Sequence, residues 1–181
     1  GRSQFLSRIK SIPGCNISSD KLFEYDSNIN EYLQLINEKR EQEIILKYFQ
    51  YLSILFTEYL LDNIKNNKDE FIFLINDFVK KYCIENRIDI DKYPLNFGDN
   101  DLNKIAFWSA TGSGKTIIMH INYHQFFKYG LFEPNNILLI TPNEGLTDQH
   151  YDELRASSIP CIKYSDGYGI TSSRIKIKQV L

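Results

Sequence analysis

One stretch constrains the fold more than any other: residues 109–116 read Ser-Ala-Thr-Gly-Ser-Gly-Lys-Thr. An apolar run, residues 105–108, precedes it, and a helix-like segment, residues 117–129, follows it. A strand, a glycine-rich turn, a Lys-Thr pair and a helix in this order predict a phosphate-binding loop. Gly112 and Gly114 allow a tight turn that brings backbone N–H groups close to an anion. The helix that follows directs its free N–H groups at the same point.

The residue types in this loop indicate which phosphate compound it binds. Lys115 can reach the outer phosphates of a nucleotide, and the hydroxyl of Thr116 can ligate the Mg²⁺ that accompanies it. The general pattern G-x-x-x-x-G-K-[ST] has a glycine where this chain has Ser109. We therefore expect ATP and Mg²⁺ as cofactors, with Lys115 and Thr116 as the catalytic residues. The expected nucleotide site comprises Ala110, Thr111, Gly112, Ser113, Gly114, Lys115 and Thr116.

Composition narrows the class of protein. The chain has 181 residues, of which 43% are hydrophobic, so it can bury a core. Its net charge of −2 excludes a strongly basic nucleic-acid footprint, so such a partner would need a local surface. The three cysteines, Cys15, Cys83 and Cys161, have neither metal-ligand spacing nor the look of a disulfide framework. With no signal peptide and no apolar stretch long enough for a bilayer, we expect a cytoplasmic location and no membrane partner.

The first hundred residues predict a helical N-terminal region, residues 1–100. Residues 1–19 look irregular, one or two short helices are expected within 22–36, and a polar loop at 63–68. The strongest helical pattern comes between them and predicts a largely buried helix. Its apolar stripe consists of Ile45, Phe49, Leu52, Phe56 and Tyr59, widened by Leu55, Leu60 and Leu61. A further helix is expected at 69–83, with a packed stripe of Phe71, Leu74, Phe78 and Tyr82.

From about residue 101 the pattern changes to strands that alternate with helices. We expect strands at 105–108, 137–140 and 161–164. Helices are expected at 116–129, ended by Gly130, and at 146–154. This alternation predicts an α/β fold with a parallel sheet and crossover helices.

A second motif follows the strand at 137–140. The strand leads into Thr141-Pro142, and Leu146 and Gln149 follow on a predicted helix. Loops at the carboxyl ends of parallel strands bind ligands. Thr141 and the backbone N–H groups after Pro142 could bond the phosphates of a nucleic acid without reading its bases. Near the end of the chain, Arg174, Lys176 and Lys178 alternate with isoleucines and would share one strand face. That face is either simply solvated or adds charge to the same surface.

Together these motifs resemble one family. Residues 110–116 are similar to motif I of superfamily-two helicases and translocases, and Thr141-Pro142 with Leu146 and Gln149 looks like motif Ia. Residues 102–108, 119–122 and 141–150 resemble the DEAD/DEAH-box-like branch that includes the motor subunits of type I and type III restriction systems. The resemblance covers about residues 45–181. It implies a RecA-like lobe with a three-layer parallel sheet, and ATP hydrolysis coupled to movement along nucleic acid, which in this family is usually DNA.

The chain also departs from that family. These motors place an acidic pair at the end of a strand, but Asp152-Glu153 and Asp69-Glu70 both fall on predicted helices. Nothing resembles the second lobe, so residues 101–181 are expected to be the front part of a first RecA-like lobe. The glutamine that reads adenine should lie upstream of motif I, and Gln42 and Gln50 are both candidates.

Two histidines and the overall function leave alternatives open. His120 and His124 have the spacing of a helical metal pair, but no third ligand is near, which favours packing or hydrogen bonding.

The expected function is the ATP-binding front section of a helicase or translocase, inactive by itself, with other restriction-system subunits as possible partners. The alternatives are a nucleotide switch without a nucleic-acid partner and a scaffold with an inactive loop.

Overall fold

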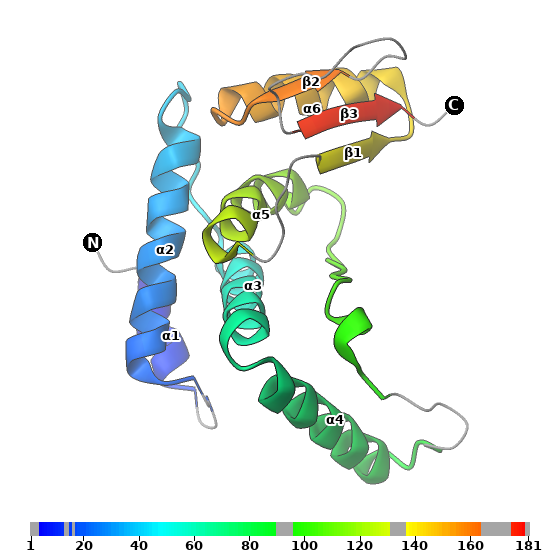
Figure 1. Ribbon diagram of the computed structural model, residues 1–181. Coiled ribbons are helices and arrows are strands. Elements are labelled where there is room, and N and C mark those ends of the chain that lie inside the picture. Colours follow the sequence, from blue (N-terminus) through cyan, green and yellow to red (C-terminus); the bar gives the residue numbers. More distant parts are fainter. Residues whose placement is uncertain are drawn as a thin grey trace.

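The computed structural model describes residues 4–12, 15, 17–89, 96–130, 137–163 and 175–179. It is a mixed α/β structure, mostly helical, with one small parallel sheet (Figure 1). The elements in chain order are α1 (Gln4–Lys10), α2 (Ser19–Asn37), α3 (Tyr48–Asn66), α4 (Lys68–Glu85), η1 (Asp99–Asp101), α5 (Lys115–Tyr129), β1 (Ile137–Thr141), α6 (Glu144–Ala156), β2 (Cys161–Lys163) and β3 (Ile175–Gln179).

Helices α2 and α3 pack on α5, the helix that follows the glycine-rich loop (Figure 1). Ser18 caps α2 by accepting a hydrogen bond from the N–H of Lys21, which fixes where that helix begins. Ile54 of α3 and Ile121 of α5 are fully buried in the same apolar cluster as Ile29 of α2. The expected boundary near residue 100 stays a prediction, but this core extends across it.

The first helices differ from what the sequence predicted. Within residues 1–19, expected to be irregular, α1 forms because Leu6 and Ile9 bury one helical face against the same cluster. The turn expected at Pro13-Gly14 lies outside the described residues. Residues 22–36, expected to form one or two short helices, belong to a single helix of 19 residues, α2.

Helix α3 buries only part of the apolar stripe that the sequence predicted: Leu55 and Leu61 are each 1% exposed, but other members of the stripe face outward. Phe49 and Phe56 are 47% and 60% exposed, and Ile45 precedes the helix and is 78% exposed. The buried face also includes Glu58, which is fully inaccessible, and Asp62. The reason is long-range: polar side chains from α2 and α5 hydrogen-bond these carboxyl groups and draw that face inward.

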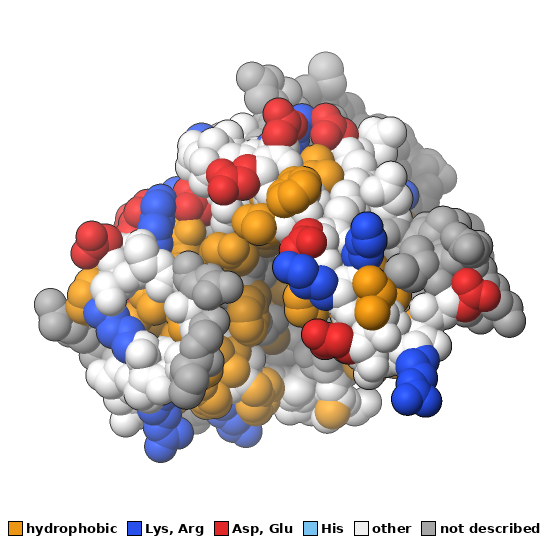
Figure 2. All heavy atoms as spheres, turned by 90° about the horizontal axis from the view of Figure 1, so that it is seen from below, with side chains coloured by type: hydrophobic (Ala, Val, Ile, Leu, Met, Phe, Trp, Pro, Cys, Tyr) orange, Lys and Arg blue, Asp and Glu red, His pale blue; other side chains and the backbone are white. Residues whose placement is uncertain are grey.

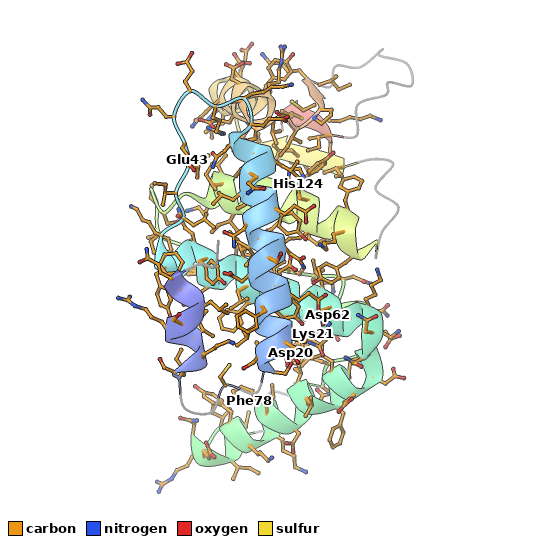
Figure 3. The ribbon with its side chains drawn as sticks, turned by 90° about the vertical axis from the view of Figure 1, so that its left-hand side faces the viewer. Asp20, Lys21, Glu43, Asp62, Phe78 and His124 are labelled. Carbon is orange, nitrogen blue, oxygen red and sulfur yellow. The ribbon has the colours of Figure 1, made fainter. Side chains whose placement is uncertain are left out.

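The buried polar contacts form two groups. Glu58 accepts hydrogen bonds from Asn28 (2.9 Å), Gln125 (2.9 Å) and Tyr129 (2.8 Å). Closer to the start of α2, Asp62 accepts from Tyr25 at 2.6 Å and pairs with Lys21 at 3.0 Å, and the labelled Lys21 and Asp62 lie together in Figure 3. Hydrogen bonds to carboxylates are stronger than neutral ones, so these groups fix α2, α3 and α5 relative to one another.

Helix α4 extends away from this core. The loop predicted at 63–68 is reduced to the single break at Asn67, because α3 continues to Asn66 and α4 begins at Lys68. Phe71 is buried, but Leu74, Phe78 and Tyr82 are 48%, 66% and 50% exposed, so most of the expected packed stripe faces outward. Hydrophobic side chains gather on the face of the molecule seen from the α4 side (Figure 2).

The strand predicted at 105–108 is absent: these described residues form no regular element. A strand needs a neighbour to complete its hydrogen-bond ladder, and among the described residues no strand pairs with this segment. Cavities of about 650 Å³ and 570 Å³ lie beside it, the first against α3 and the second against α5 and β1, and Phe107 lines both. Trp108 is fully exposed.

The sheet has the order β1-β3-β2, with all strands parallel. Ile137 of β1 and Cys161 of β2 both lie opposite Ile175 of β3. A second apolar cluster, formed by Leu154, Ile159, Cys161, Ile175 and Ile177, joins the sheet to α6, and Met119 and Tyr123 of α5 pack against it. The strands at 137–140 and 161–163 and the helices α5 and α6 are therefore confirmed, as is Gly130 as the end of α5.

One face of the sheet carries this cluster, and the other is less covered. Leu138 and Ile140 point away from the cluster and are 54% and 58% exposed. The predicted three-layer arrangement would need further cover on this side, so it stays a prediction. No helix in the described parts of the chain is long and apolar enough to cross a membrane.

Candidate nucleotide site

The glycine-rich loop turns through two left-handed residues into α5. Gly112 and Gly114 have φ angles of 75° and 81°, a conformation that a side chain would strain. The N–H of Ser113 donates to the carbonyl of Ala110 at 3.2 Å, which closes the turn. Gly114 precedes α5 and no side chain caps this helix start. The first N–H groups of α5 are thus directed at the concave side of the loop, an arrangement suited to an anion.

Lys115 lies exposed at the start of α5. Its Nζ donates to the carbonyl oxygens of Ser109 and Ala110, at 3.0 Å and 2.9 Å. Ser109, which replaces the first glycine of the general pattern, therefore contributes through its backbone, and a serine can supply this carbonyl as well as a glycine. Lys115 is held beside the loop by contacts that a phosphate oxygen could replace.

A glutamine from α3 supports the loop from behind. Gln50 is 8% exposed, and its Nε2 donates to the carbonyl of Ser113 at 2.8 Å. A Cβ at Gly114 would lie 2.3 Å from the same Nε2, so a side chain there would displace Gln50 in addition to being strained by the φ of 81°. Gln42, the other candidate, is exposed in the loop before α3. The hydroxyl of Ser113 is buried and has no hydrogen-bond partner among the described residues.

The acidic residues agree with the sequence analysis. Asp152 and Glu153 lie on α6, and Asp69 and Glu70 lie in the first turn of α4. Glu153 pairs with Arg40 at 2.9 Å. Among the described residues no three His, Cys, Asp or Glu side chains come together as a metal site, and Thr116 as a ligand of Mg²⁺ stays a prediction.

The second motif forms a turn that α6 holds in place. Asn143 caps α6 by accepting from the N–H of Leu146 at 2.9 Å. Thr141 is 2% exposed, and its hydroxyl hydrogen-bonds that of Thr147 at 2.5 Å. Its side chain therefore orients the turn from inside, and the exposed part of the turn is Pro142 to Gly145. Glu144 places a carboxyl group there, which opposes a phosphate.

The two helical histidines have separate partners. His120 is fully buried, and its Nδ1 lies 2.8 Å from the hydroxyl of Ser157. Burial, together with the positive charge of Arg40, lowers the pKa of His120 to about 4, so it is neutral at pH 7. His124 stacks on Tyr32, and burial lowers its pKa as well. His120 is thus held by a hydrogen bond and His124 by packing, the two roles that the sequence favoured over a metal pair.

The basic residues near the end of the chain are described only in part. Lys176 is half-buried on β3, where it lies opposite Leu138 and Ile162. Arg174 and the side chain of Lys178 lie outside the described residues. A shared basic face therefore stays a prediction.

Sequence comparison agrees with these features. The family model described as the type III restriction enzyme res subunit matches residues 72–177, from α4 to β3. No curated protein and no solved structure matches the chain. The match spans more than half of the sequence and includes both the glycine-rich loop and the Thr141-Pro142 turn.

The family match, which includes the glycine-rich loop, points to a helicase-like protein of superfamily two. The chain belongs to the family of type III restriction enzyme res subunits. At the level of the family this means ATP-dependent, helicase-like activity of the restriction type, with ATP and Mg²⁺ as its general cofactors and nucleic acid as its general partner.

Proposed function

We propose that this chain supplies the ATP-binding part of an ATP-dependent DNA helicase or translocase in a restriction-type defence system. The observation that carries the proposal is the loop at 109–116. Its two left-handed glycines, its uncapped helix start and its exposed lysine combine the features that a triphosphate requires. A RecA-like sheet around this loop, and a cytoplasmic location, belong to the same proposal.

In this proposal the main chain of the loop and the start of α5 hold the phosphates. Lys115 exchanges its two carbonyl partners for phosphate oxygens, and Thr116 ligates Mg²⁺, which neutralises charge on the phosphates. The full proposed site is Ala110, Thr111, Gly112, Ser113, Gly114, Lys115 and Thr116.

Gln50 is the glutamine that we assign to this site. Both ends of its amide are already bonded, since Nε2 donates to Ser113 and Oε1 accepts from the N–H of Lys47 at 2.8 Å. Gln50 therefore acts first by positioning the loop. Contact with adenine would require Gln50 to release one of these bonds.

The surface proposed for DNA is the exposed turn after β1. The backbone N–H groups at the start of α6 can donate to a phosphate, and Thr141 orients them through Thr147. Such contacts carry no base information, so binding should be independent of sequence. The preference for DNA over RNA, and other restriction subunits as partners, are suggested by the family alone.

Replacing one lysine tests the nucleotide site. Lys115→Ala should weaken binding of ATP by about 1.5–3 kcal/mol, the range for a hydrogen bond to a charged group. Titration calorimetry with a non-hydrolysable ATP analogue measures this difference. The matched control is Lys104→Ala, which removes an exposed lysine from the preceding segment and should leave the affinity unchanged. Equal affinities for Lys115→Ala and the wild type would contradict the assignment.

The same chain should release no measurable phosphate from ATP. None of the described strands is followed by an acidic pair. The sequence also shows no second-lobe motif that would carry an arginine finger, and such a finger alone contributes about 10³–10⁵ in rate. A malachite-green assay with Mg²⁺ checks this expectation. Phosphate release that disappears in Lys115→Ala would show that the chain completes the catalytic site by itself.

Nucleotide binding without any DNA binding at low salt would favour the switch over the motor.

A further inference from the structure

Three parts of the chain that are far apart in sequence meet at the hydroxyl of Ser157. His120 of α5 lies 2.8 Å from it through Nδ1, and Arg40, from the loop between α2 and α3, donates to it through Nη2 at 2.8 Å. The same Nη2 also bonds Glu153 of α6, at 2.9 Å to the carboxylate and 3.3 Å to the carbonyl. We call these four residues the Ser157 node.

The node is buried and incompletely bonded. Ser157 and His120 are fully inaccessible, and the side chain of Arg40 is 14% exposed. Two of its buried nitrogens, Nε of Arg40 and Nε2 of His120, have no partner among the described residues. Unsatisfied buried polar atoms oppose folding, so an apolar contact would stabilise the same crossing at a lower cost. Because the unsatisfied atoms of the Ser157 node reduce stability, we look for its role in the parts of the chain that it connects.

The node connects the two helices that begin at the proposed ligand sites. Helix α5 starts at Lys115 in the glycine-rich loop, and His120 follows about one and a half turns later. Helix α6 starts beside the Thr141-Pro142 turn, and Ser157 caps its other end. Thr147 binds Thr141, so the turn moves with α6.

We propose that the Ser157 node couples nucleotide binding at the glycine-rich loop to DNA binding at the turn after β1, with Ser157 and Arg40 as positioning residues. This inference rests on the proposed function. When Lys115 leaves the carbonyls of Ser109 and Ala110 for a phosphate, the loop and the first turn of α5 must adjust. His120 passes that adjustment to Ser157, and α6, a rigid helix of 13 residues, passes it to the turn.

The test measures DNA affinity of the full chain with and without nucleotide. The probes are a fluorescein-labelled DNA oligonucleotide, at low salt, and a non-hydrolysable ATP analogue with Mg²⁺. The wild-type ratio of the two dissociation constants should lie within about 5- to 150-fold, the usual range for coupled sites. Ser157→Ala removes the shared hydroxyl and should bring this ratio to within twofold of one, while each ligand alone binds within about twofold of the wild type.

Two further variants keep the result interpretable. Glu153→Gln changes a side chain that is 39% exposed, so the protein should fold even if Ser157→Ala does not, and the ratio should again fall. Lys163→Gln breaks an exposed ion pair between β2 and Asp148 of α6, outside the Ser157 node, and should keep the wild-type ratio.

Each alternative outcome has a distinct meaning. If Ser157→Ala keeps the wild-type ratio, the coupling is overturned; where that variant does not fold, the same result in Glu153→Gln overturns it. A parallel loss of both affinities also overturns the coupling, because it indicates a purely structural role. A wild-type protein that binds both ligands with a ratio of one overturns the coupling and leaves the proposed function intact. A wild-type protein that binds no DNA overturns both.

Discussion

Two buried clusters meet at α5, and they differ in what stabilises them. The cluster under α1, α2 and α3 combines large apolar side chains with buried carboxyl groups, of which Glu58 alone accepts three hydrogen bonds. The cluster between α6 and the sheet is apolar and small, and the opposite face of β1 leaves Leu138 and Ile140 exposed.

The difference between the two clusters shows that the helical cluster, rather than the sheet cluster, positions the glycine-rich loop. Ile118 and Ile121 of α5 belong to the helical cluster, whereas Met119 and Tyr123 only border the sheet cluster. Gln50 of α3 contacts the loop directly, while a cavity of about 570 Å³ lies between α5 and β1. The N-terminal helices therefore act as the scaffold of the candidate nucleotide site, and the sheet is the less constrained side.

The strongest way to break this arrangement is to remove Glu58. Glu58→Ala removes the acceptor of Asn28 and of Tyr129 and one of the two acceptors of Gln125, and each buried unsatisfied group costs about 1–3 kcal/mol. We expect the free energy of unfolding, measured in urea, to fall by roughly 3–5 kcal/mol. The control is Glu31→Ala, whose side chain is 64% exposed and 3.7 Å from Lys128, and which should cost under about 1 kcal/mol. Similar losses in both variants would show that the buried network does not hold α3 to α5.

How much of this could be read from the sequence differs between the two clusters. Helices α5 and α6 and strand β1 were predicted because their signals are local: the period of the apolar residues and Gly130 at a helix end. The burial of Glu58 on α3 was not predicted, because its partners Asn28 and Gln125 lie 30 and 67 positions away in the chain.

The candidate site shows the same limit. The glycine-rich loop is a local pattern, and the structure gives it the left-handed glycines that the pattern requires. The choice between Gln42 and Gln50 depended on a contact across 63 residues, and the Arg40–Ser157 contact spans 117 residues. The strand at 105–108 was mispredicted because apolar residues favour a strand only where a neighbouring strand can pair with them.

Acid should weaken the contact between α5 and α6 through His120. Its pKa is lowered to about 4 by burial, whereas an unfolded histidine titrates near 6.5. Between these values the unfolded state binds a proton that the folded state does not, so stability is full above about pH 6.5 and falls as the pH drops toward 4. The loss should reach roughly 3 kcal/mol.

Thermal or urea unfolding at several pH values between 4 and 7 measures this loss. The variant His120→Asn should show a flatter dependence than the wild type across the same window, and His124→Gln separates the smaller contribution of the second histidine. An unchanged slope in His120→Asn would show that other groups cause the acid sensitivity.

The smallest expected effect tests whether the outer face of β1 is uncovered. Ile140 is 58% exposed, so Ile140→Thr should change the free energy of unfolding by less than about 0.5 kcal/mol. The same substitution at Ile177, which is 1% exposed in the sheet cluster, loses apolar burial and buries a hydroxyl, and should cost about 2–4 kcal/mol. Urea unfolding of the two variants compares one chemistry on the two faces of one sheet. A cost at Ile140 close to that at Ile177 would mean that the outer face is covered in solution, and the sheet would then be as well packed as the helical part.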